Sequence, residues 1–373
     1  MKRILFMPFL QIPSGHHQVA NGVIESLQTN DLFECEKIDI LSYSYGKVEV
    51  FVSKFYIKWI HLLPAFYSWL YKKTVYKNNE RSRFYLYEWL LLNQVEKLIK
   101  EKNPQLIICT HALPSYLLNL LKEKNKLSVP VINIYTDYFI NHLWGIKYID
   151  YHFVPTKEIK NELIERGVIP ENILVTGIPI HPHFKDNIDR NKSNEIFSVL
   201  ICGGNLGAGL MKTFVKKLQP SGKIRYTVLC GKNQKLLNWI QQQNYPLIQA
   251  LPYISSKEKM NKLYNSVDAI ITKPGGVTIS ECLYKKIPIF IYHELPGQEE
   301  INLRNLKKWG LVYHLDNWKK TRDFEQNILQ ILSCENHQKQ FKQHLDNYHQ
   351  HLYSEQHISV FINKLLSREM IVN

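Results

Sequence analysis

The 373-residue sequence lacks any run of about 18 to 20 apolar residues, the length that a membrane-spanning helix requires. The longest candidate, residues 59–71, is shorter, contains Pro64 and runs into Lys72 and Lys73. The opening MKRILFMPF has a basic start and a short apolar run but no small-residue cleavage site, so it predicts a first strand instead of a secretion signal. We therefore expect a protein that does not span the membrane.

Paired cysteines are also missing. The six cysteines are scattered, form no Cys-x-x-Cys pair, and lie mostly in apolar runs such as LIICT and TVLCG. This pattern is typical of buried thiols in a reducing cytoplasm, and it argues against a disulfide framework or a cysteine zinc site.

Negative charge is in short supply. With 47 Lys and Arg against 33 Asp and Glu, the formal net charge is +14, which predicts an anionic partner. The sequence has no RNA-binding signature, zinc-finger spacing or basic heptad region, so we expect no nucleic acid. An acidic membrane surface and a phosphorylated substrate remain as candidates.

Short runs rich in Ile and Val, among them LIICT, SVLICGG and IPIFIY, alternate with helical patterns. This alternation predicts parallel sheets covered on both faces, an α/β fold. The polar stretch 181–196 reads as a linker, because strand signals restart after it. We expect one domain at 1–185, a second at 195–340 and a helical tail at 341–373. The tail is expected to pack outside the second sheet, and its return to the first domain is a further possibility.

Three turns have the composition of anion-binding or catalytic loops. In AIITKPGGVTISECL (269–283), a buried strand leads through a tight turn into a helix whose free N–H groups suit a diphosphate. The turn CGGNLGAG (202–209) repeats this arrangement without the glycine spacing of dinucleotide sites. In PSGHHQ (13–18), His16 or His17 could accept a proton at cytoplasmic pH. Each could also be a purely structural turn.

The segment from Tyr43 to Trp89 contains fifteen aromatic residues interleaved with Lys and Arg. Aromatic stripes are usually buried, so a helical hairpin with an aromatic core is one interpretation. The other is a membrane-contact surface, because Trp and Tyr favour the bilayer interface and basic residues favour anionic lipid. The residues predicted to make this contact are Trp59, Trp69, Lys72, Lys73 and Lys77.

Six stretches carry a further signal, and they are PSGHHQVA, TDYFINHLW, ELIERGVIPENILVTGIPIHPHF, LCGKNQKL, ITKPGGVTISECL and LPGQEEIN. Together they resemble glycosyltransferase family 28, in particular the bacterial processive diacylglycerol β-glucosyltransferases and the monogalactosyldiacylglycerol synthases. The resemblance implies the GT-B architecture, in which two Rossmann-like domains face a cleft. It also implies that the N-terminal domain binds the acceptor, that the C-terminal domain binds the UDP-sugar, and that neither metal nor cofactor is needed; the chain contains no Asp-x-Asp pair.

The resemblance also assigns roles to individual residues. His16 is the candidate general base, with His17 as second choice, and Asp137 orients the base or the acceptor. Glu281 would bind the ribose hydroxyls, because an ionised carboxylate can accept two hydrogen bonds. The remaining donor-binding candidates are Gly204, Gly231, Lys232, Tyr253 (beside uracil), Gly275, Gly276, Val277 and Thr278 (beside the diphosphate), and Gln298, Glu299 and Asn302 (beside the sugar).

The resulting hypothesis is an inverting transfer of glucose or galactose from UDP-glucose or UDP-galactose to diacylglycerol, by a cytoplasmic enzyme held peripherally on the inner face of the cell membrane. Two alternatives stay open. One is the lipid-linked N-acetylglucosaminyltransferase of cell-wall synthesis, and the other is a membrane protein that senses UDP-sugar without turning it over.

Overall fold

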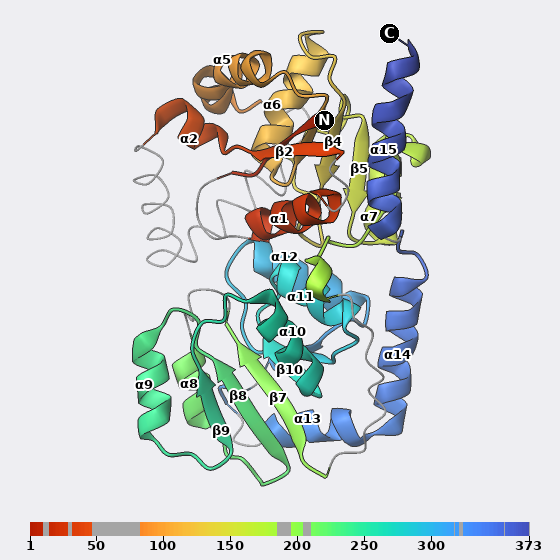
Figure 1. Cartoon of the computed structure of the whole chain (residues 1–373). Coiled ribbons are helices and arrows are strands. Elements are labelled where there is room, and N and C mark those ends of the chain that lie inside the picture. The colour runs from red at the N-terminus through yellow and green to blue at the C-terminus, as the bar shows by residue number, and fades with distance from the viewer. Residues whose placement is uncertain are drawn as a thin grey trace. The chain divides into compact units, whose positions relative to one another are not determined.

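The computed structural model describes residues 1–9, 15–28, 32–46, 83–184, 195–203, 210–316, 318–320, 324–353 and 355–372 (Figure 1). Two compact units divide the chain: unit 1 is Met1–Pro182 with His351–Asn373, and unit 2 is His183–Gln350. The predicted boundary between 185 and 195 falls on 185–194, outside the described residues. The helices of the predicted tail are shared between the units.

The described part of unit 1 contains a parallel six-stranded sheet in the order β2-β1-β3-β4-β5-β6. Its strands are β1 (Lys2–Met7), β2 (Phe33–Lys37), β3 (Leu106–Cys109), β4 (Val131–Ile134), β5 (Tyr151–Val154) and β6 (Ile173–Val175). β3 and β4 are buried along their whole length, as expected for central strands of a parallel sheet covered on both faces.

The helices of unit 1 follow the strands in the β-α alternation that the sequence predicts. They are α1 (Gly15–Gln28), α2 (Ile40–Tyr45), α5 (Tyr85–Lys102), α6 (Ala112–Glu123), α7 (Lys157–Glu165) and α15 (Glu355–Val372). Short 3-10 turns lie at Pro170–Asn172 and Pro182–Phe184.

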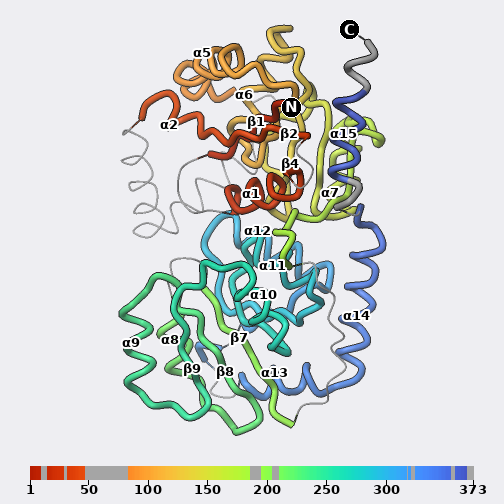
Figure 2. The backbone as a smooth tube through the Cα atoms, in the orientation of Figure 1, coloured from red at the N-terminus to blue at the C-terminus, as the bar shows by residue number. Residues whose placement is uncertain are grey.

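The helix α15 packs beside strand β5 of unit 1 (Figure 1), and Figure 2 shows the same course of its backbone. The Phe361 ring lies edge-on to Tyr151 and Phe153, with ring centroids 5.0 and 5.7 Å apart. Ile358, Ile362 and Leu366 are buried. The end of the chain therefore completes a domain that began at its first strand.

Unit 2 contains, in its described residues, a second parallel six-stranded sheet in the order β12-β11-β10-β7-β8-β9. Its strands are β7 (Phe197–Cys202), β8 (Ile224–Leu229), β9 (Ile248–Leu251), β10 (Ala269–Thr272), β11 (Ile289–Ile291) and β12 (Tyr313–His314). Counted from β7, this is the Rossmann order 3-2-1-4-5-6.

The helices of unit 2 are α8 (Met211–Lys217), α9 (Gln234–Gln242), α10 (Lys257–Ser266), α11 (Gly276–Tyr284), α12 (Gln298–Lys308), α13 (Phe324–Ser333) and α14 (Glu335–His349). One face of the sheet packs against α8, α9 and α13 around Phe214. Leu200 and Ile270, which alternate with residues of that cluster, are also fully buried. Both faces are covered, and the predicted α/β class is confirmed.

Among the described helices, none combines the length and the apolar content needed to cross a bilayer. Residues 59–71, the longest apolar candidate in the sequence, lie outside the described part of the chain.

Candidate functional site

Both sheets have a point where the strand order reverses, and in open α/β sheets ligands bind beyond the carboxyl ends of the strands at that point. In unit 1 the reversal lies between β1 and β3, because β2 is on the other side of β1. In unit 2 it lies between β7 and β10. The sequence-predicted residues can be judged by their distance from these two places.

His16 lies at the reversal of unit 1, in the first turn of α1, which follows β1. Its Nδ1 is 2.8 Å from the carbonyl oxygen of Thr110, the residue that follows β3. The hydroxyl oxygen of Thr136, two residues after β4, is also 2.8 Å from Nδ1. The ends of three strands thus converge on one imidazole nitrogen.

These contacts fix which nitrogen of His16 carries the proton. A carbonyl oxygen can only accept a hydrogen bond, so Nδ1 must be the protonated nitrogen that donates to Thr110. In the neutral ring Nε2 then keeps its lone pair. Burial lowers the pKa of His16, opposed by the charge of Asp137 and by the Thr110 hydrogen bond. The folded chain therefore favours a neutral imidazole that can accept a proton at Nε2.

Asp137 directly follows Thr136, and its charge acts on His16. The loop that continues from it is held at Gly145, whose N–H donates to Ser115 Oγ at 3.0 Å and whose carbonyl accepts from Asn133 Nδ2 at 2.8 Å. Both predicted catalytic residues of unit 1 therefore lie at the same end of the sheet, on segments fixed by buried hydrogen bonds. Their catalytic roles remain a prediction.

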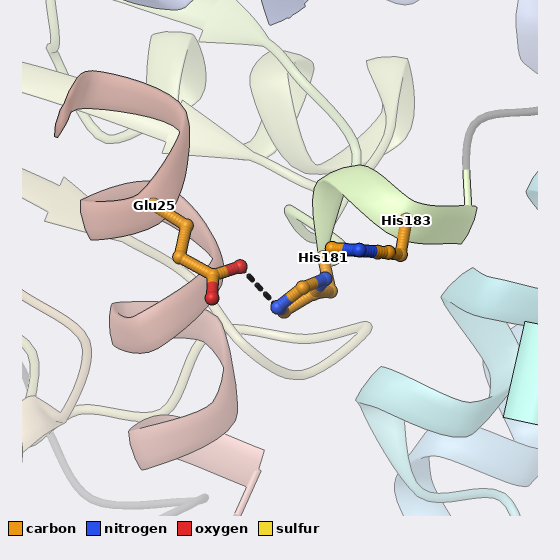
Figure 3. A group of neighbouring side chains, drawn as sticks. All are labelled: Glu25, His181 and His183. Atoms are coloured by element: carbon orange, nitrogen blue, oxygen red, sulfur yellow. Dashed lines mark ion pairs between the residues drawn. The ribbon is translucent and has the colours of Figure 1, made fainter. Parts of the chain in front are cut away.

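Helix α1 (Gly15–Gln28) is also held in place near its C-terminal end, away from His16. Glu25 points from α1 toward His181, with which it forms an ion pair (Figure 3). Gly22 lies so close to the segment after β6 that an added Cβ would meet the backbone of Ile180 and His181 at 3.3 Å. These contacts limit how far the helix, and with it His16, can shift.

His111 was not predicted from the sequence, although it lies beside His16. Its ring is edge-on to that of His16, with centroids 4.7 Å apart, and Phe9 is on another side at 5.1 Å. Burial, together with the nearby His16 and His17, holds the pKa of His111 well below its usual value. The available signal was the polar pair Thr110 and His111 directly after the apolar run LIIC, at the carboxyl end of a predicted central strand.

In unit 2 the reversal point carries the glycine turn that the sequence predicts. Gly275 is the N-cap of α11, and Gly276 is its first residue. A Cβ added at Gly275 would meet nothing within 4 Å, so the protein itself does not need a glycine there. Gly276, Val277 and Thr278 form the first turn of α11, where backbone N–H groups have no partner within the helix. This is the usual place for an anion to bind.

Side chains from α12 secure this turn. Lys273, the residue after β10, forms an ion pair with Glu299 at 3.3 Å, and Glu299 also accepts from the Leu295 N–H at 2.6 Å. Asn302, which is 1% exposed, donates to the Pro274 carbonyl at 3.1 Å. Gln298 is the first residue of α12. Lys273 was not predicted as a site residue, and it places a positive charge next to the diphosphate candidates.

Glu281 is almost fully buried on α11 and accepts a hydrogen bond from the Tyr264 hydroxyl at 2.8 Å. Burial raises the pKa of its carboxyl, while the charge of Lys257 and the Tyr264 hydrogen bond act in the opposite direction. The pKa of Tyr264 is raised, chiefly by burial, so its hydroxyl stays a donor. One oxygen of Glu281 thus has a fixed partner in the protein.

The remaining described donor candidates lie after β8 and β9. Gly231 has a positive φ of 58°, which favours glycine. The Lys232 ammonium lies 5.6 Å from the ring centroid of Tyr253, which is 43% exposed. The sites of the other predicted residues lie outside the described part of the chain; they are Gly204, Trp59, Trp69, Lys72, Lys73 and Lys77.

Comparisons with known proteins find similar sequences and similar structures. The family model described as monogalactosyldiacylglycerol (MGDG) synthase matches residues 16–180. The uncharacterized glycosyltransferase YkoN of Bacillus subtilis is 44% identical over 350 residues, 93% of this chain and 93% of that protein. The processive diacylglycerol beta-glucosyltransferase of Bacillus pumilus is 26% identical over 347 residues, 90% of this chain and 88% of its own.

Among solved structures, MurG of Acinetobacter baumannii is similar with a TM-score of 0.63 at 14% identity, covering 98% of this chain and 100% of that one. At this level of identity the likeness concerns the fold alone. It agrees with the two Rossmann-like units described above, and the predicted GT-B fold is confirmed.

Proposed function

Because the chain belongs to glycosyltransferase family 28, we propose that it transfers glucose or galactose from a UDP-sugar to the hydroxyl of diacylglycerol, with inversion at the anomeric carbon. The names of the family model and of the B. pumilus relative support this lipid acceptor. The observation that carries the proposal is the hydrogen bond from His16 Nδ1 to the Thr110 carbonyl, because it leaves a proton-accepting nitrogen at the reversal point of unit 1.

In the proposed reaction His16 Nε2 takes the proton of the acceptor hydroxyl while the oxygen attacks the anomeric carbon. A base positioned in this way typically contributes 10² to 10⁴ in rate. Asp137 stabilises the imidazolium that forms, since its charge already favours the protonated ring. The bond between the anomeric carbon and the diphosphate oxygen breaks, and UDP leaves with the electron pair.

The leaving diphosphate would be stabilised by the N–H groups at the start of α11 and by the charge of Lys273. Glu281 would take the ribose hydroxyls, and Tyr253 would lie beside uracil. Gln298, Glu299 and Asn302 would face the sugar, with Glu299 linking the sugar site to Lys273. We propose that these groups suffice without a metal ion or a cofactor.

A peripheral position on an anionic membrane is part of the proposal. The described residues at the end of the aromatic segment support it, because the first turns of α5 expose Tyr85 (70%), Leu86 (65%) and Trp89 (78%). Glu88, on the same turns, is buried and forms an ion pair with Arg83, which fixes the start of the helix. Exposed aromatic residues next to a basic segment are typical of proteins that contact the bilayer interface.

The decisive measurement is UDP release from UDP-glucose and UDP-galactose in the presence of vesicles that contain diacylglycerol, with and without EDTA. We expect release with at least one donor, dependence on diacylglycerol, and no loss with EDTA. Donor binding without release would favour the sensor alternative. Release only from UDP-N-acetylglucosamine with a lipid-linked acceptor would favour the cell-wall alternative.

A further inference from the structure

His111 has a fixed tautomer, opposite to that of His16. It is the N-cap of α6, and its Nδ1 accepts a hydrogen bond from the Leu113 N–H at 3.1 Å. A backbone N–H can only donate, so Nδ1 carries no proton, and in the neutral ring the proton is on Nε2. His111 is therefore a neutral donor at Nε2.

Capping does not explain why this residue is a histidine. Asn, Asp and Ser are the preferred N-caps and would accept the same backbone hydrogen bond. What histidine adds is the second nitrogen, and within the described residues the structure records no hydrogen bond for Nε2 of His111. The same holds for Nε2 of His16, whose recorded hydrogen bonds are made by Nδ1.

The two rings thus form a complementary pair. His16 presents an acceptor, His111 presents a donor, and their centroids are 4.7 Å apart. A ligand that carries a hydroxyl close to an ester carbonyl offers a proton to His16 and a hydrogen-bond acceptor to His111. Diacylglycerol has this arrangement, since its free hydroxyl lies one glycerol carbon away from an acyl ester.

We propose that His111 determines acceptor specificity by donating its Nε2–H to the ester carbonyl oxygen next to the hydroxyl that His16 deprotonates. The inference rests on the proposed function and extends it to the chemical class of the acceptor. A dialkylglycerol, in which ethers replace the esters, has the hydroxyl but no carbonyl. The N–H of His111 would then lose its carbonyl partner, and a site built to hydrogen-bond that carbonyl penalises the loss.

The test compares dioleoylglycerol with the matching dioleyl ether in vesicles of the same composition, using UDP release to measure kcat/KM for each. For the wild type we expect the ester to be preferred by roughly tenfold, the effect of one lost hydrogen bond to a neutral group. His111→Asn keeps an acceptor for the N-cap hydrogen bond and removes the N–H at the Nε2 position. The variant should therefore use the ester and the ether with about equal kcat/KM. His111→Gln restores an N–H near the Nε2 position and should recover most of the preference.

Three results separate the possibilities. Equal use of ester and ether by the wild type, or an undiminished preference in a folded His111→Asn variant, would overturn the role of His111 while leaving diacylglycerol transfer intact. If neither lipid supports UDP release, the proposed function itself fails, and this inference fails with it. Melting temperatures of both variants show whether the cap is intact, and the Gln variant decides the matter if the Asn variant unfolds.

Discussion

The two units have sheets of the same size and direction but carry different chemistry at the point where the strand order reverses. Unit 1 places His16 and His111 there, and burial lowers the pKa of each. Unit 2 places a glycine turn and Lys273 there, with the buried carboxyl of Glu281 on the helix that follows. Neutral imidazoles suit the transfer of a proton, whereas a helix N-terminus with a lysine suits an anion.

The different chemistry of the two units follows from the residues that come directly after the strands. In unit 1 the strand exits carry threonines that hold an imidazole, through Thr110 after β3 and Thr136 after β4. In unit 2, strand β10 is followed by a Pro-Gly-Gly turn, and a Cβ added at Gly275 would have no atom within 4 Å. One topology therefore supports a proton-transfer site or an anion site, depending on a few residues after each strand. Changing those residues tests the division of roles.

The largest effect is expected at His16. His16→Ala should lower kcat by roughly a hundredfold or more, because a positioned base is lost. UDP affinity, measured by calorimetry, should hardly change, since the proposed donor site is in unit 2. His17→Ala is the matched control and should have a smaller effect; the reverse order would show that His17 is the base.

The next effect concerns membrane attachment, which we assign to unit 1. Replacing Lys72, Lys73 and Lys77 by Glu should weaken co-sedimentation with anionic vesicles by about a hundredfold, at on the order of 1 kcal/mol per basic residue near the surface. Raising salt to 1 M should imitate the variant, because the Debye length falls to about 3 Å. Turnover of a short-chain, water-soluble acceptor should persist. Co-sedimentation that is unchanged by the replacements and by 1 M salt would favour the interpretation of this segment as a helical hairpin with an aromatic core.

Removing the carboxyl of Glu281 tests the nucleotide site that we propose for unit 2. Glu281→Ala should weaken UDP-sugar binding by about 1.5 to 3 kcal/mol through the loss of hydrogen bonds to the ribose. The variant also leaves the Tyr264 hydroxyl without its partner, so part of any loss reflects stability. Tyr264→Phe isolates that part and should leave donor affinity nearly unchanged. Wild-type affinity in folded Glu281→Ala would remove Glu281 from the site.

The smallest effect concerns the pH dependence of stability. Burial lowers the pKa of His152, in unit 1, to about 3. Its folded pKa is below its unfolded value, so the stability it contributes is present above about pH 6.5 and is lost as pH falls toward 3. Between pH 6.5 and 5 this loss is about 1.6 kcal/mol.

His152→Asn can still accept from the Tyr135 hydroxyl, which is 2.9 Å from His152 Nδ1, but it does not titrate. Between pH 6.5 and 5, the free energy of unfolding measured with denaturant should therefore fall by about 1.6 kcal/mol less in the variant than in the wild type. An unchanged slope would mean that other groups cause the acid sensitivity of unit 1.

The sequence was sufficient where the signal is local. Apolar runs ending in Pro-Gly-Gly predicted the turn before α11, and the alternation of runs and helical patterns predicted the α/β fold. The environment of His16 was not predictable in this way, because its partners Thr110 and Thr136 are 94 and 120 residues away in the chain. The same limit applies to Glu281, whose partner Tyr264 is brought close only by packing of α10 against α11.

Helix α15 has a consequence for how the protein is made. Unit 2 is one continuous stretch, His183–Gln350, so all of it leaves the ribosome before unit 1 is complete. The face of unit 1 that Phe361 and Ile362 cover must wait for the last residues to be translated. The domain that is started first is thus finished last, and a chaperone that shields exposed apolar surface during synthesis would act mainly on unit 1.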